Sequence, residues 1–151
     1  MYYDVIMTRF TNGFIFSPDL TRVLLIHKNR PDWMKGKLNG IGGKLEDGES
    51  MLQCIVREIH EETGLDTAES EWVRLGDLGS DDWQMDVFTM RHTGKESDAR
   101  TMEDEEVEWF DVAALPNTVM SNLPWLIALA IDKLSSDELD TFSCQYNRKK
   151  S

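Results

Sequence analysis

The sequence predicts an α/β fold in which one mixed β-sheet is covered by helices on both faces. Apolar, β-compatible segments alternate with two amphipathic helical segments, which is the pattern of a layered α/β domain. The hydrophobic share of 40% and the charged share of 29% are those of a chain that buries a core. A length of 151 residues suits a single domain over residues 1–151.

Two apolar, β-compatible segments open the chain, at residues 3–10 and 22–28, and we expect a strand in each. Turn-forming residues at 11–13 and 17–19 are expected to separate them. Residues 29–48 are rich in glycine and therefore predict a loop in which the backbone makes close approaches.

A helix is predicted directly after this loop. Ser50 and Gln53 have the spacing of a capping box, and Gly64 supplies a stop signal. The apolar residues between them recur at the helical period and form one face that packs on a sheet: Leu52, Ile55, Val56 and Ile59.

The second half of the chain predicts a strand pair and a second helix. Residues 71–78 and 83–91 have strand composition, and residues 107–110 form a further short strand. Residues 122–134 form an amphipathic helix. The tail from about residue 135 is polar enough to be loosely ordered.

Acidic residues are concentrated in two segments of the chain. Lys and Arg number 16 against 28 Asp and Glu, for a net charge of −12. Residues 43–65 hold six acids and two bases, and residues 96–111 hold eight acids and one base. This balance argues against binding duplex nucleic acid, which requires Lys and Arg against the phosphates. A small anionic ligand that arrives with a divalent metal is compatible with it.

Nothing in the sequence predicts a membrane or secretory location. The start has no cationic stretch followed by a long apolar segment, and the apolar run 125–131 spans only seven residues. Cys54 and Cys144 form no disulfide framework and no metal-binding spacing. We therefore expect a cytoplasmic protein with no membrane partner, and the oligomeric state stays open.

Three carboxylates are predicted to share one side of the first helix. Glu58, Glu61 and Glu62 are spaced i, i+3 and i+4 near the helix C-terminus, where negative charge is unfavourable. Such a cluster is either a solvated acidic face or a site for a cation. Mg²⁺ or Mn²⁺ would be the natural ligand, because both prefer carboxylate oxygens.

The loop and helix together resemble the Nudix box, G-x5-E-x7-R-E-U-x-E-E-x-G-U with U aliphatic. Every position of that pattern is matched, by Gly43, Glu49, Arg57, Glu58, Ile59, Glu61, Glu62, Gly64 and Leu65. The resemblance implies a Nudix-type α/β/α sandwich. It also implies an enzyme that uses water and a divalent metal to hydrolyse a nucleoside diphosphate linked to another group.

The resemblance assigns roles to individual residues. Glu58, Glu61, Glu62 and the Gly42 carbonyl are expected to bind metal, and Arg57 with Glu49 to orient these glutamates. The family often adds a carboxylate from a later loop as a base or a further ligand. The acidic run before Trp109 offers that group. Glu105 is the first choice and Asp104 the next, while Glu103 and Glu106 also stay open.

Substrate contacts are predicted from two segments that resemble MutT-type triphosphate hydrolases. Asn39 and Asn122 are candidates for reading a purine base, although Asn39 also suits a turn and Asn122 a helix cap. Basic residues near the site are candidates for binding phosphate: Lys28, Arg30 and Lys44.

The expected substrate is a small-molecule nucleotide. A (deoxy)nucleoside triphosphate with an oxidised purine, such as 8-oxo-dGTP, is the leading candidate, and its products would be the monophosphate and pyrophosphate. ADP-ribose or a dinucleoside polyphosphate is the alternative, and a catalytically silent nucleotide-binding module is a third possibility.

Overall fold

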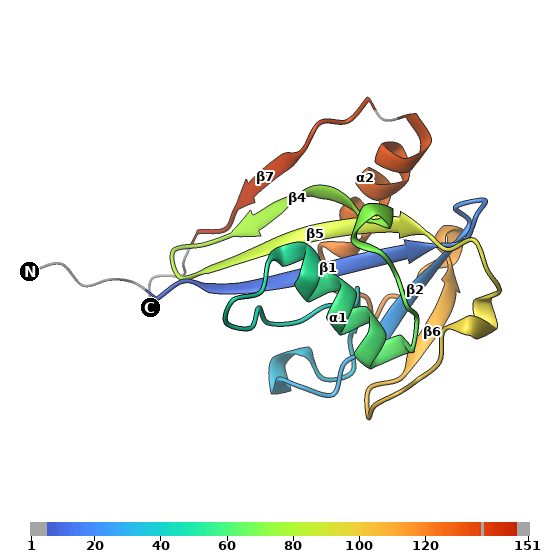
Figure 1. The fold of residues 1–151 in the computed structure, drawn as a ribbon, viewed down its shortest axis with the longest axis horizontal. Coiled ribbons are helices and arrows are strands. Elements are labelled where there is room, and N and C mark those ends of the chain that lie inside the picture. The colour runs from blue at the N-terminus through green and yellow to red at the C-terminus, as the bar shows by residue number, and fades with distance from the viewer. Residues whose placement is uncertain (1–5, 137, 148–151) are drawn as a thin grey trace, which may run out of the picture.

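The computed structural model describes residues 6–136 and 138–147, which form one mixed sheet between two α-helices (Figure 1). Among these residues the sheet has seven strands in the order β3-β2-β1-β5-β4-β7, and β6 pairs with β2. The strands are β1 (Thr8–Phe16), β2 (Arg22–His27), β3 (Leu38–Asn39), β4 (Val73–Gly79), β5 (Trp83–Arg91), β6 (Val107–Asp111) and β7 (Phe142–Gln145). The helices are α1 (Met51–Thr63) and α2 (Leu123–Ser136).

The sheet is mixed, as predicted. The central pair β1 and β5 is parallel, from Thr8 opposite Trp83 to Phe16 opposite Arg91, and β4 and β7 are also parallel. The remaining pairs are antiparallel. The parallel central pair requires a long crossover, and α1 lies within it.

Alternation along β1 divides the buried residues into two cores. Phe14 and Phe16 are fully buried in a core with the apolar face of α2, whereas Ile15 is fully buried in a core with α1. Figure 1 shows α1 across one face of the sheet and α2 against the other. The predicted α/β/α layering is therefore confirmed.

Helix α1 forms as its local signals predict. The Ser50 hydroxyl accepts a hydrogen bond from the Gln53 amide, and the Gln53 side chain accepts one from Ser50. Gly64 ends the helix in the left-handed region at φ 77°. Ile55 and Ile59 have no solvent exposure, which fixes the helix on the sheet and leaves its acidic side outward.

The first strand differs from the prediction. β1 runs over residues 8–16, so the predicted turn at 11–13 lies inside it, and residues 3–5 of the predicted strand lie outside the described residues. Gly13 occurs there because a Cβ would meet Ile55 at 2.7 Å and Trp72 at 3.2 Å. Close packing, rather than a turn, explains this glycine.

The C-terminal segment also differs from the prediction of a loose tail. Helix α2 extends to Ser136, two residues beyond the predicted end, and β7 then pairs with β4. Alternate β7 residues are exposed, so this edge strand lacks the apolar run that would reveal it in a sequence. Within the described residues, neither helix has the length and apolar character needed to cross a membrane.

Candidate active site

Arg57 connects the loop before α1 to the acidic side of the helix. Its Nε donates to Glu49 at 2.7 Å, and its Nη1 donates to Glu58 at 2.9 Å and to Glu61 at 3.2 Å. Its Nη2 donates to the Lys44 carbonyl at 3.1 Å and to the second Glu49 oxygen at 3.0 Å. The structure thus brings together the predicted positioning pair Arg57–Glu49, and the pair orients two helix glutamates.

Two glycines allow the loop backbone to pack closely, Gly43 against Glu58 and Gly42 against β1. A Cβ on Gly43 would overlap the Glu58 carboxylate, and a Cβ on Gly42 would overlap the Thr11 backbone. The side chain of Glu58 is only 13% exposed. The Gly42–Gly43 backbone and Glu58 therefore lie at the same place in the fold, as required if both were to contact one metal ion.

Glu62 is the most electrostatically unfavourable carboxylate of the helix. Its Oε2 is buried without a hydrogen-bond partner. Burial, together with the charges of Glu103 and Glu58, raises the pKa of Glu62 to about 7. Burial also raises the pKa of Glu58, although Arg57 opposes the shift. An orphaned carboxylate oxygen among like charges is the environment that a divalent cation would relieve.

The carboxylates of the acidic loop lie in two different environments. Glu105 is 3% exposed and accepts hydrogen bonds from Lys28 Nζ at 3.0 Å and from the Asn29 amide at 2.6 Å. Burial alone would raise the pKa of Glu105, but these two hydrogen bonds and the charges of Lys28 and Arg30 together leave the pKa below its usual value. The charge of Glu103, by contrast, helps to raise the pKa of Glu62.

Glu105, the first choice for the loop base, therefore lies in different surroundings from Glu103. Glu105 ties the loop to the end of β2, and the charges of both Glu103 and Glu105 raise the pKa of Glu62, that of Glu103 more strongly. The sequence could not distinguish them, because both belong to one acidic run and the choice depends on the path of the loop. Arg30, predicted to bind phosphate, pairs with Asp104 at 2.7 Å in the same loop.

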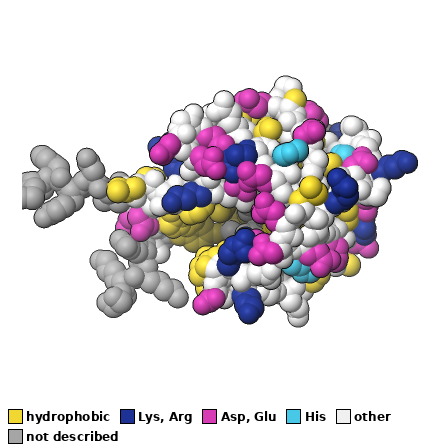
Figure 2. Space-filling view, turned by 60° about the horizontal axis from the view of Figure 1, so that its bottom comes forward, with side chains coloured by type: hydrophobic (Ala, Val, Ile, Leu, Met, Phe, Trp, Pro, Cys, Tyr) yellow, Lys and Arg dark blue, Asp and Glu magenta, His cyan; other side chains and the backbone are white. Residues whose placement is uncertain are grey.

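A cavity of about 720 Å³ adjoins the loop that precedes α1. Gly42, Gly43 and Lys44 form part of its wall, so it opens next to the helix glutamates. Figure 2 shows a hollow with hydrophobic walls and charged side chains at its rim. Four of the five predicted substrate-binding residues line it, and Arg30 does not: the four are Asn39, Asn122, Lys28 and Lys44. The apolar walls come from Phe10, Trp33, Met34, Leu78, Trp83, Met85, Met120 and Tyr146.

Three asparagines contribute amides to this cavity. Asn39 Oδ1 accepts from the Gly40 amide at 2.8 Å and from Asn12 Nδ2 at 3.2 Å, which leaves the Nδ2 group of Asn39 as its ligand-facing donor. The Oδ1 atoms of Asn12 and Asn122 are buried, and neither has a hydrogen-bond partner in the part of the chain that the structure describes. The Asn122 side chain does not cap α2, although its backbone carbonyl accepts from the Leu126 amide.

Asn12 is a candidate binding residue that the sequence analysis missed. It is 3% exposed and was assigned to a turn that does not form. The feature that indicates its role is its place on β1. Asn12 lies on the face of the strand that carries Phe10, Phe14 and Phe16. A polar residue at a core-facing position of a strand needs a partner, and here one of its two amide atoms has none.

Comparison with known proteins identifies the family. The NUDIX domain model matches residues 8–129, so the chain belongs to the Nudix family. It is 33% identical over 91 residues to the NAD-capped RNA hydrolase NudC of Pseudomonas aeruginosa PAO1, which covers 57% of this chain and 31% of that protein. The chain thus spans about a third of that relative. It is 34% identical over 102 residues to the oxidized purine nucleoside triphosphate hydrolase of Danio rerio, which covers 66% of this chain and 64% of that protein.

Solved structures share the fold. The Bacillus halodurans MutT protein superposes with a TM-score of 0.68 and 25% identity, covering 93% of this chain and 91% of that one. An ADP-ribose pyrophosphatase from Streptococcus suis superposes with a TM-score of 0.66 and 19% identity, covering 92% and 98%. The predicted Nudix-type fold is confirmed.

The raised pKa of Glu62 predicts how the metal-free protein responds to pH. The folded state favours the protonated acid, so its stabilising contribution is complete below the ordinary pKa of 4.5 and is lost as pH rises through about 7. In the presence of a chelator, Glu62→Gln should unfold at higher urea concentration than the parent above pH 7. The two proteins should unfold together below pH 4.5. A difference that does not change with pH would contradict this assignment.

Proposed function

We propose that this chain is a divalent-metal-dependent pyrophosphohydrolase that cleaves a guanine-type (deoxy)nucleoside triphosphate, including its 8-oxo form, to the monophosphate and pyrophosphate. The observation that carries the proposal is a cavity of about 720 Å³ beside a cluster of carboxylates, lined by asparagines of which two have amide oxygens without a hydrogen-bond partner among the described residues. Family membership and the oxidized purine nucleoside triphosphate hydrolase of Danio rerio among the relatives support it.

The carboxylates fit a divalent metal with oxygen ligands. Glu58, Glu61 and Glu62 would hold it, with the Gly42 carbonyl and Glu103 as further donors. Mg²⁺ or Mn²⁺ bound there would supply positive charge to the phosphoryl oxygens and lower the pKa of a water molecule.

The remaining chemistry belongs to the chain itself. Arg57 holds Glu58 and Glu61 in fixed positions, so these side chains need little reordering when the substrate arrives. Lys44, on the cavity wall next to Gly43, would bind a phosphate oxygen. Glu103, whose charge raises the pKa of Glu62, would accept a proton from an attacking water.

The cavity amides match the edge of guanine. Asn39 can only donate into the cavity, whereas the Oδ1 atoms of Asn12 and Asn122 can only accept. Guanine offers one carbonyl acceptor at O6 and two donor groups, N1–H and the 2-amino group. 8-Oxoguanine retains all three. Adenine, the base of ADP-ribose, offers a single donor group on its pairing edge and would leave an acceptor unpaired.

Aromatic side chains suit the faces of the base. Trp83 forms part of the cavity wall and packs against Tyr146 with a centroid separation of 5.9 Å. Trp33 is 68% exposed and lines the cavity from the loop between β2 and β3. A base held between such walls would bury aromatic surface that now contacts water.

Reversing the polarity of Asn39 tests base recognition. Asn39→Asp keeps the acceptor for the Gly40 amide but replaces the ligand-facing donor with a carboxylate oxygen. We expect kcat/KM for dGTP and 8-oxo-dGTP to fall about 10- to 100-fold, the cost of about 1–3 kcal/mol for an unpaired polar group. The measurement is kcat/KM across dGTP, 8-oxo-dGTP, dITP and dATP.

For the parent protein, kcat/KM should fall as the base loses hydrogen-bond donors. Loss of the 2-amino group in dITP should cost about tenfold relative to dGTP, and dATP should be poorer still. Asn117→Asp makes the same chemical change at an exposed position that does not line the cavity, and it should leave the ranking unaltered. If Asn39→Asp kept the parental ranking, base recognition by these amides would be wrong.

A further inference from the structure

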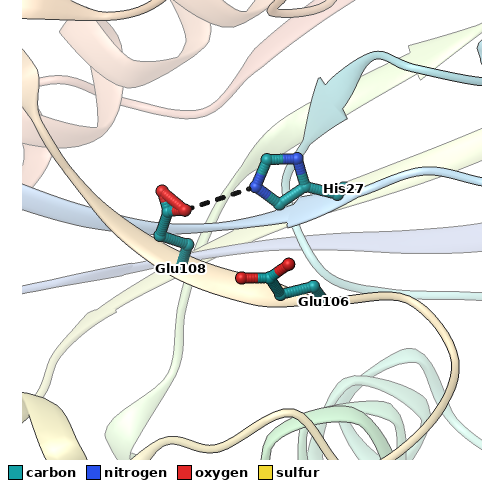
Figure 3. A group of neighbouring side chains, drawn as sticks. All are labelled: His27, Glu106 and Glu108. Atoms are coloured by element: carbon teal, nitrogen blue, oxygen red, sulfur yellow. Dashed lines mark ion pairs between the residues drawn. The ribbon is translucent and has the colours of Figure 1, made fainter.

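A second cluster of metal-ligating side chains lies on β2 and β6, outside the helix glutamates. It consists of His27, Glu106 and Glu108, whose ligand atoms all lie within 4.8 Å of one another. Figure 3 shows the imidazole and the two carboxylates pointing toward one another across the two strands. Backbone pairing fixes this arrangement, because the His27 amide donates to the Glu106 carbonyl at 2.8 Å.

The cluster faces away from α1. Ile26 and Val107 are paired across β2 and β6, and both are buried in the α1 core. Side chains alternate along a strand, so the neighbouring His27 and Glu108 point to the opposite face. The His27 ring lies 5.9 Å from the Phe110 ring on that face, which restricts its orientation. This cluster is therefore separate from the carboxylates of α1.

The Nε2 atom of His27 is the ring nitrogen that faces Glu108. His27 Nε2 is buried and has no hydrogen-bond partner, and it lies 3.5 Å from Glu108 Oε1. That separation is longer than an ordinary N–H···O hydrogen bond. Two donors that share one tetrahedral ion at bond lengths of about 2.1 Å lie about 3.4 Å apart. The geometry of the pair matches shared coordination of an ion better than a direct hydrogen bond.

We propose that His27, Glu106 and Glu108 form a second metal site that selects Zn²⁺ or a similar transition-metal ion over Mg²⁺. Zn²⁺ binds both imidazole nitrogen and carboxylate oxygen, whereas Mg²⁺ prefers oxygen ligands alone. Three protein ligands leave a fourth position for water or another ligand. This site is independent of the function proposed above.

A metal ion bound at this site would stabilise the acidic loop. Glu106 follows Glu105, which is bonded to Lys28 next to His27, so an ion would add a further link between the end of β2 and this loop. The same loop carries Glu103 toward Glu62. Zinc binding would thus stabilise the loop without contacting the helix glutamates.

Zinc stoichiometry tests the proposal with the untagged full chain. Free Zn²⁺ is titrated in competition with a chromophoric chelator, for the parent, His27→Gln, Glu108→Gln and the double variant Glu61→Gln/Glu62→Gln. We expect His27→Gln and Glu108→Gln each to lose one zinc equivalent or to weaken it at least about tenfold. The helix double variant should retain that equivalent, which separates this site from the proposed catalytic one.

His60→Gln is the matched control, because His60 is exposed on α1 and pairs with Asp66 at 2.8 Å. It should bind zinc as the parent does. X-ray absorption of the double variant loaded with one zinc should show one imidazole nitrogen among oxygen ligands. An unchanged zinc equivalent in both His27→Gln and Glu108→Gln, or no zinc bound by the helix double variant, would overturn the proposal and leave only a His–Glu ion pair.

Discussion

Replacing Glu62 with glutamine should lower kcat about 10³-fold while the chain stays folded. The change removes a carboxylate oxygen that has no hydrogen-bond partner among the described residues, and it keeps side-chain size and helix propensity. A thousandfold loss corresponds to about 4 kcal/mol of transition-state stabilisation, within the range expected when metal-held charge is lost. Glu61→Gln should act in the same direction, because Glu61 is held beside Glu58 by the same arginine.

The loss should reside in kcat rather than in KM, since the charge matters most as negative charge moves in the transition state. Steady-state kinetics with saturating metal, together with circular dichroism, is the measurement. Glu69→Gln, at an exposed site in the short 3-10 helix Glu69–Glu71, is the control and should behave as the parent does. Parental kcat in folded Glu62→Gln would contradict a role for this carboxylate.

Replacing Arg57 with lysine should lower kcat/KM about 100-fold even though the positive charge remains. Three nitrogens of the guanidinium donate hydrogen bonds, some to Glu49 and others to Glu58 and Glu61. A single ammonium cannot reproduce that fork, so the helix glutamates would lose their fixed orientation. Orienting groups around metal ligands typically contribute 10- to 100-fold in activity or metal affinity.

The metal dependence should separate the effect of Arg57→Lys from simple unfolding. We expect the variant to need more Mg²⁺ for half-maximal activity, and to lose only about 1–2 kcal/mol of stability from the missing hydrogen bonds. Arg91→Lys, which alters an exposed arginine bonded to the Leu134 carbonyl, should change neither quantity. Equal metal requirements for parent and Arg57→Lys would argue against a positioning role.

Local signals in the sequence were sufficient where local interactions determine the structure. Helix α1 begins at its Ser50–Gln53 box and ends at Gly64, because caps and periodicity act within a few residues. β1 was misplaced because Asn12 and Gly13 favour turns on their own. Contacts with distant residues place them in a strand: Asn12 bonds to Asn39, and Gly13 leaves room for Ile55.

As with the fold, the sequence predicted only those parts of the candidate site that depend on local spacing. The arrangement of the helix glutamates and Arg57 follows from helical spacing and from one loop, so the motif sufficed for it. The choice between Glu103 and Glu105 depends on how a loop about 40 residues away folds back over α1, and sequence spacing carries no information on that path. The role of Asn12 depends on which amide atom remains unpartnered, and only three-dimensional geometry reveals this.

Product analysis of dGTP and 8-oxo-dGTP hydrolysis, with millimolar Mg²⁺ or with a chelator, tests the central claim most directly. The account predicts monophosphate and pyrophosphate in equal amounts with Mg²⁺, and no turnover in the chelator. It also predicts that dGTP and 8-oxo-dGTP exceed ADP-ribose in kcat/KM. Release of inorganic phosphate, undiminished turnover in the chelator, or a preference for ADP-ribose would contradict it.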